Sequence, residues 1–128
     1  MSYVPPASII ERAGLAGATG IALTQTMPNP DSSATGLVRQ YRSAMKQYAP
    51  AGTPSTSFAL VGYLAALVTV EGLQHAGSSP TPATLVQALN KIRDLQLGGY
   101  TIDFSEGNRV GAKYVNIGVV DRNGKLMY

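Results

Sequence analysis

The sequence predicts an α/β fold, in which helices alternate along the chain with short strands. Segments with the two-residue alternation of strands are separated by segments with helical periodicity, the order typical of layered α/β proteins. Fourteen glycines and eight prolines among 128 residues indicate frequent turns, hence several short elements. Hydrophobic residues make up 45% of the chain and charged residues 13%, which is enough apolar material for a packed core.

The composition excludes several kinds of function. The formal net charge is only +3 and the basic residues are dispersed, whereas a nucleic-acid-binding protein needs a continuous basic stripe. The chain has no cysteine and one histidine, so no disulfide, no metal site and no cofactor are expected. Residues 1–6 lack the basic and apolar regions of a signal peptide, and none is expected within the chain.

The first predicted element is a helix over residues 7–13, which ends at Gly14. The glycine-rich residues 14–20 then form a connection to a strand. Their G-x-x-G-x-x-G spacing differs from the G-x-G-x-x-G spacing of a dinucleotide-binding loop, and a strand follows where that loop would begin a helix. A tight helix-to-strand connection is therefore the better interpretation.

A strand and a second helix follow. Residues 21–26 alternate apolar and polar side chains and predict the strand. The proline-rich residues 27–33 form a loop, and residues 35–48 predict a helix. Its apolar face comprises Leu37, Tyr41, Ala44 and Tyr48.

The next predicted helix is the most apolar one. It spans residues 57–76, with Ser55 or Ser57 as the N-cap and Gly77 after its end. Its longest apolar run, residues 58–70, is shorter than the roughly 20 residues that span a bilayer. Since apolar side chains surround it on nearly all sides, we expect this helix to be buried inside a larger structure.

One more helix and the last strands complete the chain. Thr81 as N-cap and Pro82 at the first position predict a helix that ends near Arg93. Its inner face comprises Leu85, Val86, Leu89 and Ile92. Residues 100–104 and 113–120 then alternate as strands.

A hairpin is predicted at the carboxyl end. Asn123 and Gly124 indicate a type I′ turn, in which both central residues have positive φ. Residues 125–128 would form the returning strand.

Four stretches of the chain resemble one known family. They are ATGIALTQTMP at residues 18–28, LVRQYR at 37–42, VGYLAA and EGLQHAG within 61–77, and GGYTIDF, YVNI and DRNGK within 98–125. In order and spacing they are similar to the last part of type I periplasmic binding proteins, the leucine/isoleucine/valine-binding receptors of ABC transporters. This resemblance implies a partial type I periplasmic-binding-protein fold, present as a truncated carboxyl-terminal fragment.

The resemblance further implies two α/β lobes joined by crossing segments. Residues 1–24 and 115–128 would belong to the second lobe and its hinge, and residues 28–110 to the first lobe. Residues 115–120 would form one crossing. The other crossing would contain the hinge residues Thr24, Gln25, Thr26 and Pro28.

The function that the resemblance implies is solute capture. Such a protein is the extracytoplasmic solute-binding component of an ABC transporter, which takes up an amino acid or a related acid in the periplasm and delivers it to a permease. Closure of the lobes replaces the water around the solute with fixed donors and apolar walls. We therefore expect a binding protein and not an enzyme.

One ligand-binding residue carries over by resemblance. Tyr63 matches the aromatic residue that lines the cleft against the ligand side chain, and packing in the core is the other interpretation of this residue. The family's acidic contact to the ligand amino group has no counterpart in residues 1–6, so either that contact is absent or the solute is not an ordinary α-amino acid. The family's serine and threonine contacts to the ligand carboxylate also have no counterpart in the chain.

A second hypothesis is a small oligomeric interaction or assembly module without ligand binding. A homo-oligomer would hide the apolar helix, and the two hypotheses are compatible because an isolated fragment could self-associate. A hydrolase is disfavoured, since no nucleophile lies beside a base in a recognisable pattern. His75, the only histidine, is placed to pair with Glu71 on the same helix.

Overall fold

The computed structural model describes residues 6–128 and confirms the α/β class. One helix and one strand are followed by three helices and then by short strands, close to the predicted order. The chain divides into two compact units. The sheet unit comprises the described residues up to Thr26 together with Val115–Tyr128, and the helical unit comprises Met27–Tyr114.

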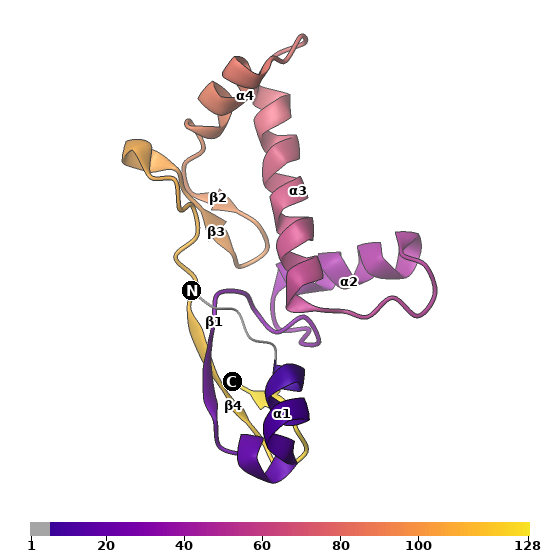
Figure 1. The fold of residues 1–128 in the computed structure, drawn as a ribbon. Coiled ribbons are helices and arrows are strands. Elements are labelled where there is room, and N and C mark those ends of the chain that lie inside the picture. The colour runs from indigo at the N-terminus through magenta and orange to yellow at the C-terminus, as the bar shows by residue number, and fades with distance from the viewer. Residues whose placement is uncertain (1–5) are drawn as a thin grey trace. The chain divides into compact units, whose positions relative to one another are not determined.

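The sheet unit is a three-stranded antiparallel sheet with one helix (Figure 1). Its elements are α1 (Pro6–Ala18), β1 (Ala22–Gln25), β4 (Asn116–Val120) and β5 (Leu126–Met127). β4 is the central strand. All four residues of β1 pair with residues of β4. Ala18 and Val120 are the buried apolar side chains among the described residues of this unit.

Helix α1 is longer than the predicted helix over residues 7–13. Gly14 interrupts it as expected, with a φ of 70° and a ψ of 162°, but helical geometry resumes and continues to Ala18. The prediction of a plain connection after Gly14 was therefore wrong. The alanines after the kink favour helix, and the Thr19 hydroxyl donates to the Leu15 carbonyl at 2.8 Å across the last turn.

The carboxyl-terminal hairpin is confirmed, but its turn is not type I′. Only Gly124 has a positive φ, of 76°, whereas Asn123 does not. The Gly124 amide donates to the Asp121 carbonyl at 3.1 Å and the Asp121 amide to the Lys125 carbonyl at 2.8 Å, the pattern of a type I turn followed by a left-handed glycine. The Asp121 carboxylate selects this turn, since it accepts from the Asn123 amide at 2.8 Å and the Lys125 amide at 2.7 Å.

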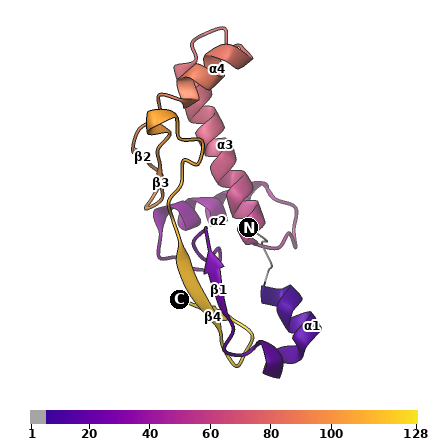
Figure 2. The same ribbon diagram turned by 60° about the vertical axis from the view of Figure 1, so that its left-hand side comes forward.

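The helical unit holds three helices and very little sheet (Figure 2). Its elements are α2 (Gly36–Tyr48), α3 (Ser57–His75), α4 (Pro82–Leu89), β2 (Leu95–Gln96), β3 (Thr101–Ile102) and the 3-10 helix η1 (Ser105–Gly107). β2 and β3 form an antiparallel pair, and Ile102 also bridges to Ala112. The sequence does not predict β2, because two residues are too few to show an alternation.

Threonines cap all three helices of this unit. Thr35 and Thr81 accept from the third helical amide, as the sequence predicts for Thr81. The cap of α3 is Thr56, whose hydroxyl accepts from the Ala59 amide at 3.1 Å, so the prediction of Ser55 or Ser57 was wrong by one residue.

Helix α4 ends earlier than predicted, at Leu89 and not near Arg93. The Ile92 amide donates to the Leu89 carbonyl at 3.1 Å. This bond spans three residues, as in a 3-10 helix, in place of the four residues of an α-helix. The Arg93 guanidinium then donates to the Asn90 carbonyl at 2.8 Å and satisfies an acceptor at this end.

The core of the helical unit joins α2, α3 and β3. Its buried members are Met27, Leu37, Val38, Tyr41, Leu60, Leu64, Ile92, Tyr100 and Ile102. The predicted face of α2 is correct for Leu37 and Tyr41, but Tyr48 in its last turn is 77% exposed. The fully buried side chains of α2, Leu37, Val38 and Tyr41, all lie in its first half. Val86 of α4 is also exposed, since Ala88 is the residue that this helix buries.

Two glycine backbones meet where α2 begins. The Leu37 amide donates to the Gly98 carbonyl at 3.0 Å, and Gly98 has a φ of 61°. A Cβ at Gly98 would lie 2.3 Å from the Leu37 nitrogen, and one at Gly36 would lie 3.0 Å from the Gly98 Cα. The amino end of α2 and the turn between β2 and β3 therefore approach at a distance that only glycine allows.

We expect Gly98→Ala to lower the free energy of unfolding by at least about 3 kcal/mol, from left-handed strain together with backbone overlap. Gly52→Ala is the matched control, because Gly52 has a φ of 81° but a Cβ at this position would meet nothing within 4 Å. It should cost about 1–2 kcal/mol from strain alone. Chemical denaturation measures both, and equal losses would show that the close approach does not matter.

Candidate functional site

One cavity of the helical unit lies beside β3. It has a volume of about 310 Å³. Its lining residues are Asp94, Gly99, Tyr100, Thr101, Asp103, Gly111, Lys113 and Tyr114. The rings of Tyr100 and Tyr114 lie 5.4 Å apart at 31°, so an aromatic pair forms one wall of this cavity.

Two ionisable groups of the cavity, Asp103 and Tyr100, have pKa values shifted away from neutral pH. The Ser105 amide donates to the Asp103 carboxylate at 2.6 Å, and this bond, the Ser105 hydroxyl and the charges of Arg93 and Lys113 lower the pKa of Asp103. Burial, and then the neighbouring Tyr114, raise the pKa of Tyr100. Asp103 therefore stays ionised and Tyr100 stays protonated at neutral pH.

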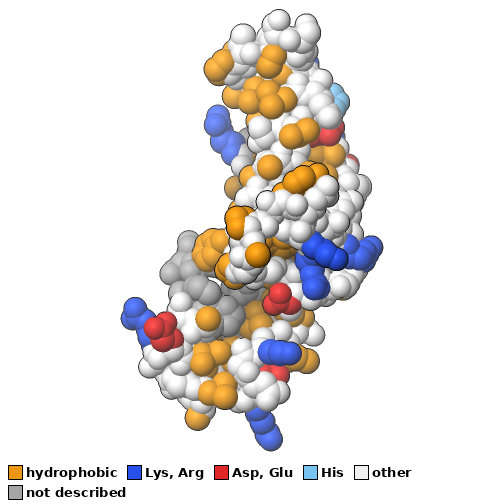
Figure 3. Space-filling model, turned by 90° about the vertical axis from the view of Figure 1, so that its right-hand side faces the viewer, with side chains coloured by type: hydrophobic (Ala, Val, Ile, Leu, Met, Phe, Trp, Pro, Cys, Tyr) orange, Lys and Arg blue, Asp and Glu red, His pale blue; other side chains and the backbone are white. Residues whose placement is uncertain are grey.

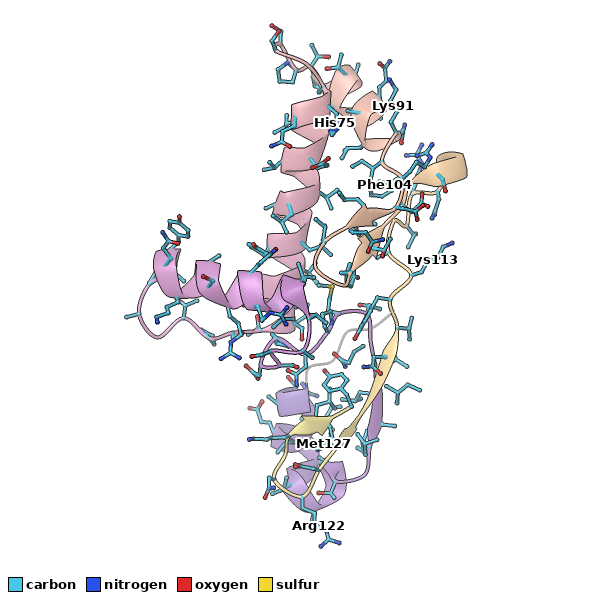
Figure 4. All side chains as sticks on the ribbon, turned by 180° about the vertical axis from the view of Figure 1, so that it is seen from behind. His75, Lys91, Phe104, Lys113, Arg122 and Met127 are labelled. Carbon is cyan, nitrogen blue, oxygen red and sulfur yellow. The ribbon has the colours of Figure 1, made fainter. Side chains whose placement is uncertain are left out.

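A second cavity lies between α3 and the end of α4. Its volume is about 230 Å³, and Glu71, His75, Lys91 and Arg93 contribute its polar groups. The His75 Nδ1 atom lies 3.4 Å from the Glu71 carboxylate and 2.9 Å from the Glu71 carbonyl, which confirms the predicted pair. Figure 4 shows His75 on α3 and Lys91 shortly after the end of α4. Among the described residues no three histidine or acidic side chains gather as a metal site.

Tyr63 lies in the first half of α3 and is half-buried. Its ring is 5.8 Å from that of Tyr41 at 58°, and it packs against the core. Core packing thus accounts for part of its environment. The ligand contact expected for Tyr63 stays a prediction.

Tyr41 carries an unusual polar group. Its side chain is 1% exposed, and its hydroxyl has no hydrogen-bond partner in the part of the chain that the structure describes. A buried hydroxyl without a partner costs about 1–3 kcal/mol.

The residues predicted to form a hinge lie where the chain passes from one unit to the other. Thr24 and Gln25 end β1, Thr26 begins a bend, and Pro28 is buried. The units divide after Thr26 and again after Tyr114. In the sheet unit Gln25 stands opposite Asn116, so both passages leave the same end of the β1–β4 ladder. A hinge motion of these residues stays a prediction.

The environment of helix α3 differs from the one that the sequence predicts. At 19 residues and a mean hydropathy of 1.4 it is long and apolar enough to cross a membrane by length and composition, because it continues past the apolar run to His75. Only 17% of its apolar window is buried, so the expected enclosure of this helix is not found within the described residues. Figure 3 shows hydrophobic side chains recurring along this part of the surface.

Sequence reasoning missed the cavity beside β3. Asp94 enters it through a left-handed φ of 45°, which no local pattern indicates. Gly98 and Gly99 mark the adjacent turn, but they do not reveal that Tyr100 and Tyr114 stack. The predicted lack of an acidic contact concerns residues 1–6, of which 1–5 lie outside the described residues.

The comparisons with known proteins agree with one another. A family model described as periplasmic binding protein matches residues 6–125. An extracellular ligand-binding receptor from Verminephrobacter eiseniae is 38% identical, with a TM-score of 0.86, over 99% of this chain and 36% of its own. A substrate-binding periplasmic protein from Ralstonia solanacearum is 34% identical, with a TM-score of 0.85, over 98% of this chain and 36% of its own.

A more distant structure shares the fold. A possible leucine/isoleucine/valine-binding protein from Rhodopirellula baltica is 23% identical, with a TM-score of 0.80, over 95% of this chain and 33% of its own. No curated protein sequence matches the chain. The chain thus spans about a third of the length of the structures it resembles.

We expect Tyr41→Phe to leave the free energy of unfolding unchanged or to raise it by up to about 1 kcal/mol, because it removes a buried hydroxyl without a partner. Tyr48→Phe, on an exposed ring, is the control and should change it by less than about 0.5 kcal/mol. Chemical denaturation measures both. A loss of more than about 1 kcal/mol in Tyr41→Phe would show that the hydroxyl has a partner.

We expect acid to weaken the turn around Asp103. Its folded-state pKa lies below the ordinary value of 3.8, so its contribution is fully present above that value and is lost as the pH falls through the lower folded-state pKa. Asp103→Asn should therefore destabilise the protein at pH 7, and its difference in stability from the parent should shrink as the pH falls below the ordinary pKa of 3.8. A difference independent of pH would contradict this assignment.

Proposed function

Because this chain belongs to the periplasmic binding protein family, we propose that it forms part of a receptor that captures a small solute and delivers it to an ABC permease. The match to the family model over residues 6–125 carries this proposal. The 38% identity to an extracellular ligand-binding receptor supports it. An amino acid or a related acid is the proposed solute, and the periplasm is the proposed compartment of the whole protein.

We assign the two units to the two lobes of that receptor. Residues 28–110 belong to the first lobe, and residues 1–24 and 115–128 to the second. The unit boundaries after Thr26 and Tyr114 support this assignment. Thr24, Gln25, Thr26 and Pro28 then form one hinge crossing, which permits the lobes to close on a solute.

The chemistry of the helical unit supports binding without catalysis. The pKa of Asp103 is lowered and that of Tyr100 is raised, so neither is adjusted toward proton transfer at neutral pH. Tyr63 is the proposed aromatic contact to the solute. Its partly exposed ring, held by Tyr41, would present an apolar surface with little freedom to lose on binding.

An oligomeric assembly module is the second candidate. The exposed apolar side chains of α3 favour it, since a homo-oligomer would cover them. It is compatible with the receptor assignment, because an isolated piece of a receptor would self-associate through the same side chains.

Calorimetry with aliphatic, aromatic and acidic solutes tests the receptor function. We expect no submicromolar binding by a monomer of this chain alone, because it spans 36% of the receptor that it resembles. Grafted in place of the equivalent part of the Verminephrobacter eiseniae receptor, it should restore binding. Submicromolar binding by the isolated monomer, or a folded graft that binds none of the solutes, would contradict the proposal.

Within that graft, Tyr63→Ala should weaken solute binding at least about tenfold if the ring contacts the solute. Tyr48→Ala is the matched control, since Tyr48 lies in the same unit and is 77% exposed. Equal affinities for the two variants would assign Tyr63 to the core alone.

A further inference from the structure

The turn of the carboxyl-terminal hairpin carries an asparagine directly before a glycine. Asn123 is exposed, and Figure 4 shows its neighbour Arg122 near the tip of this hairpin. The other asparagines of the chain, none of which precedes a glycine, are Asn29, Asn90, Asn108 and Asn116. The proposed capture of a solute makes no use of the Asn123–Gly124 dipeptide.

An asparagine in this position can lose its side-chain amide as ammonia. A base removes the proton of the Gly124 backbone nitrogen, which then attacks the Cγ carbon of Asn123. The new C–N bond closes a succinimide ring, and the C–NH2 bond breaks as the departing nitrogen takes up a proton. Water opens the ring at either carbonyl and gives aspartate or isoaspartate, so no oxidant or reductant is needed. Glycine favours the reaction because no Cβ shields its nitrogen.

The folded turn restrains the nitrogen that would attack. The Gly124 amide donates to the Asp121 carbonyl at 3.1 Å, so its proton is held and its orientation is fixed. The Asn123 amide donates to the Asp121 carboxylate at 2.8 Å, which fixes the peptide before it as well. Removal of the Gly124 proton therefore requires the turn to open, as hydrogen exchange of an amide does.

The Asp121 side chain keeps this turn closed. Its carboxylate also accepts from the Lys125 amide at 2.7 Å. That bond, and after it the Asn123 amide and carboxamide, lower the pKa of Asp121, although desolvation opposes the shift. The carboxylate is therefore charged at neutral and alkaline pH, the range in which base promotes the loss of ammonia.

Helix α1 lies against the same turn. A Cβ at Gly124 would lie 3.0 Å from the Ile10 Cδ1 atom and 3.4 Å from the Leu15 Cδ1 atom. Isoaspartate would lengthen the main chain here by a methylene group and place a second carboxylate beside Asp121. β5, which follows the turn, has two residues, and both pair with β4. A longer and more negative turn would therefore weaken the pairing of β5.

We propose that Asn123 is a site of deamidation, that Asp121 limits its rate by holding the turn closed, and that the isoaspartate product releases β5 from β4. The loss of ammonia is irreversible in dilute solution, so the product accumulates with the age of the molecule. This inference goes beyond the proposed function and does not depend on it.

Peptide mapping by mass spectrometry tests the site. The whole chain would be kept at mildly alkaline pH, either folded or unfolded in guanidinium chloride, and amide loss followed at each asparagine. In the unfolded chain we expect Asn123 to react first. In the folded chain it should react at least about tenfold more slowly, because only the opened turn reacts. Earlier reaction of another asparagine in the unfolded chain, or equal rates at Asn123 in both conditions, would overturn the proposal.

Asp121→Ala should raise the rate at Asn123 in the folded chain at least about threefold and leave the rate in the unfolded chain unchanged. Asp31→Ala, at an exposed aspartate of a loop in the other unit, is the matched control and should change neither rate. Circular dichroism shows whether each variant is folded. A folded Asp121→Ala variant with the parent rate would contradict the role of Asp121.

The parent chain decides the same point without a substitution, even where Asp121→Ala does not fold. Low concentrations of guanidinium chloride should speed hydrogen exchange of the Gly124 amide and deamidation of Asn123 in parallel, since both need the same opening. Rates that vary independently would contradict the restraint by the turn.

The release of β5 is measured on the isoaspartate form, separated by ion exchange. Its β5 amides should exchange hydrogen at least about tenfold faster than those of the parent. Asn123→Asp is the matched control, because it adds the same charge without lengthening the main chain, and it should exchange nearly as the parent does. Equal exchange in the isoaspartate form and the parent would overturn the release of β5.

Discussion

The helical unit depends on one backbone contact, where the start of α2 meets the turn between β2 and β3. A Cβ at Gly98 would overlap the backbone of Gly36 and Leu37, a Cβ at Gly36 would be tight against Gly98, and the Leu37 amide donates to the Gly98 carbonyl. Next to this contact, Leu37 enters the core, and Tyr100 both joins the core and lines the cavity beside β3. A side chain at Gly98 would therefore disturb the approach of two segments, one that carries Leu37 into the core and one that leads to Tyr100 in the candidate site.

Helix α3 shows how one composition serves several structural roles. Its inner side is fixed by Leu60 and Leu64 in the core and by the approach of Gly72 to α4. Its outer side is equally apolar, which gives the helix the length and hydropathy of a membrane span. A helix placed between two protein layers has the same composition as one placed in lipid, so only its neighbours distinguish the two cases.

Local signals in the sequence predict much of this fold, and long-range contacts account for the rest. Thr81 and Pro82 begin α4 as predicted, because a cap acts within one turn. The end of α4, by contrast, depends on the Arg93 side chain reaching back to a carbonyl, and the hairpin turn depends on the Asp121 carboxylate overriding a common dipeptide preference. The cavity could not be predicted, since Asp94 and Tyr114 are distant in sequence and no local pattern links them.

Reversible capture places a different demand on ionisable groups than catalysis does. A catalytic group must change its protonation near neutral pH, whereas a binding group must keep one state while the solute arrives and leaves. The bond from Ser105 holds Asp103 in its charged form, and burial holds Tyr100 in its protonated form. Both groups thus offer the same hydrogen-bonding atoms across the neutral range. Conformational change is another way in which a binding protein controls affinity, and it is the role proposed for the crossing at Thr24, Gln25, Thr26 and Pro28.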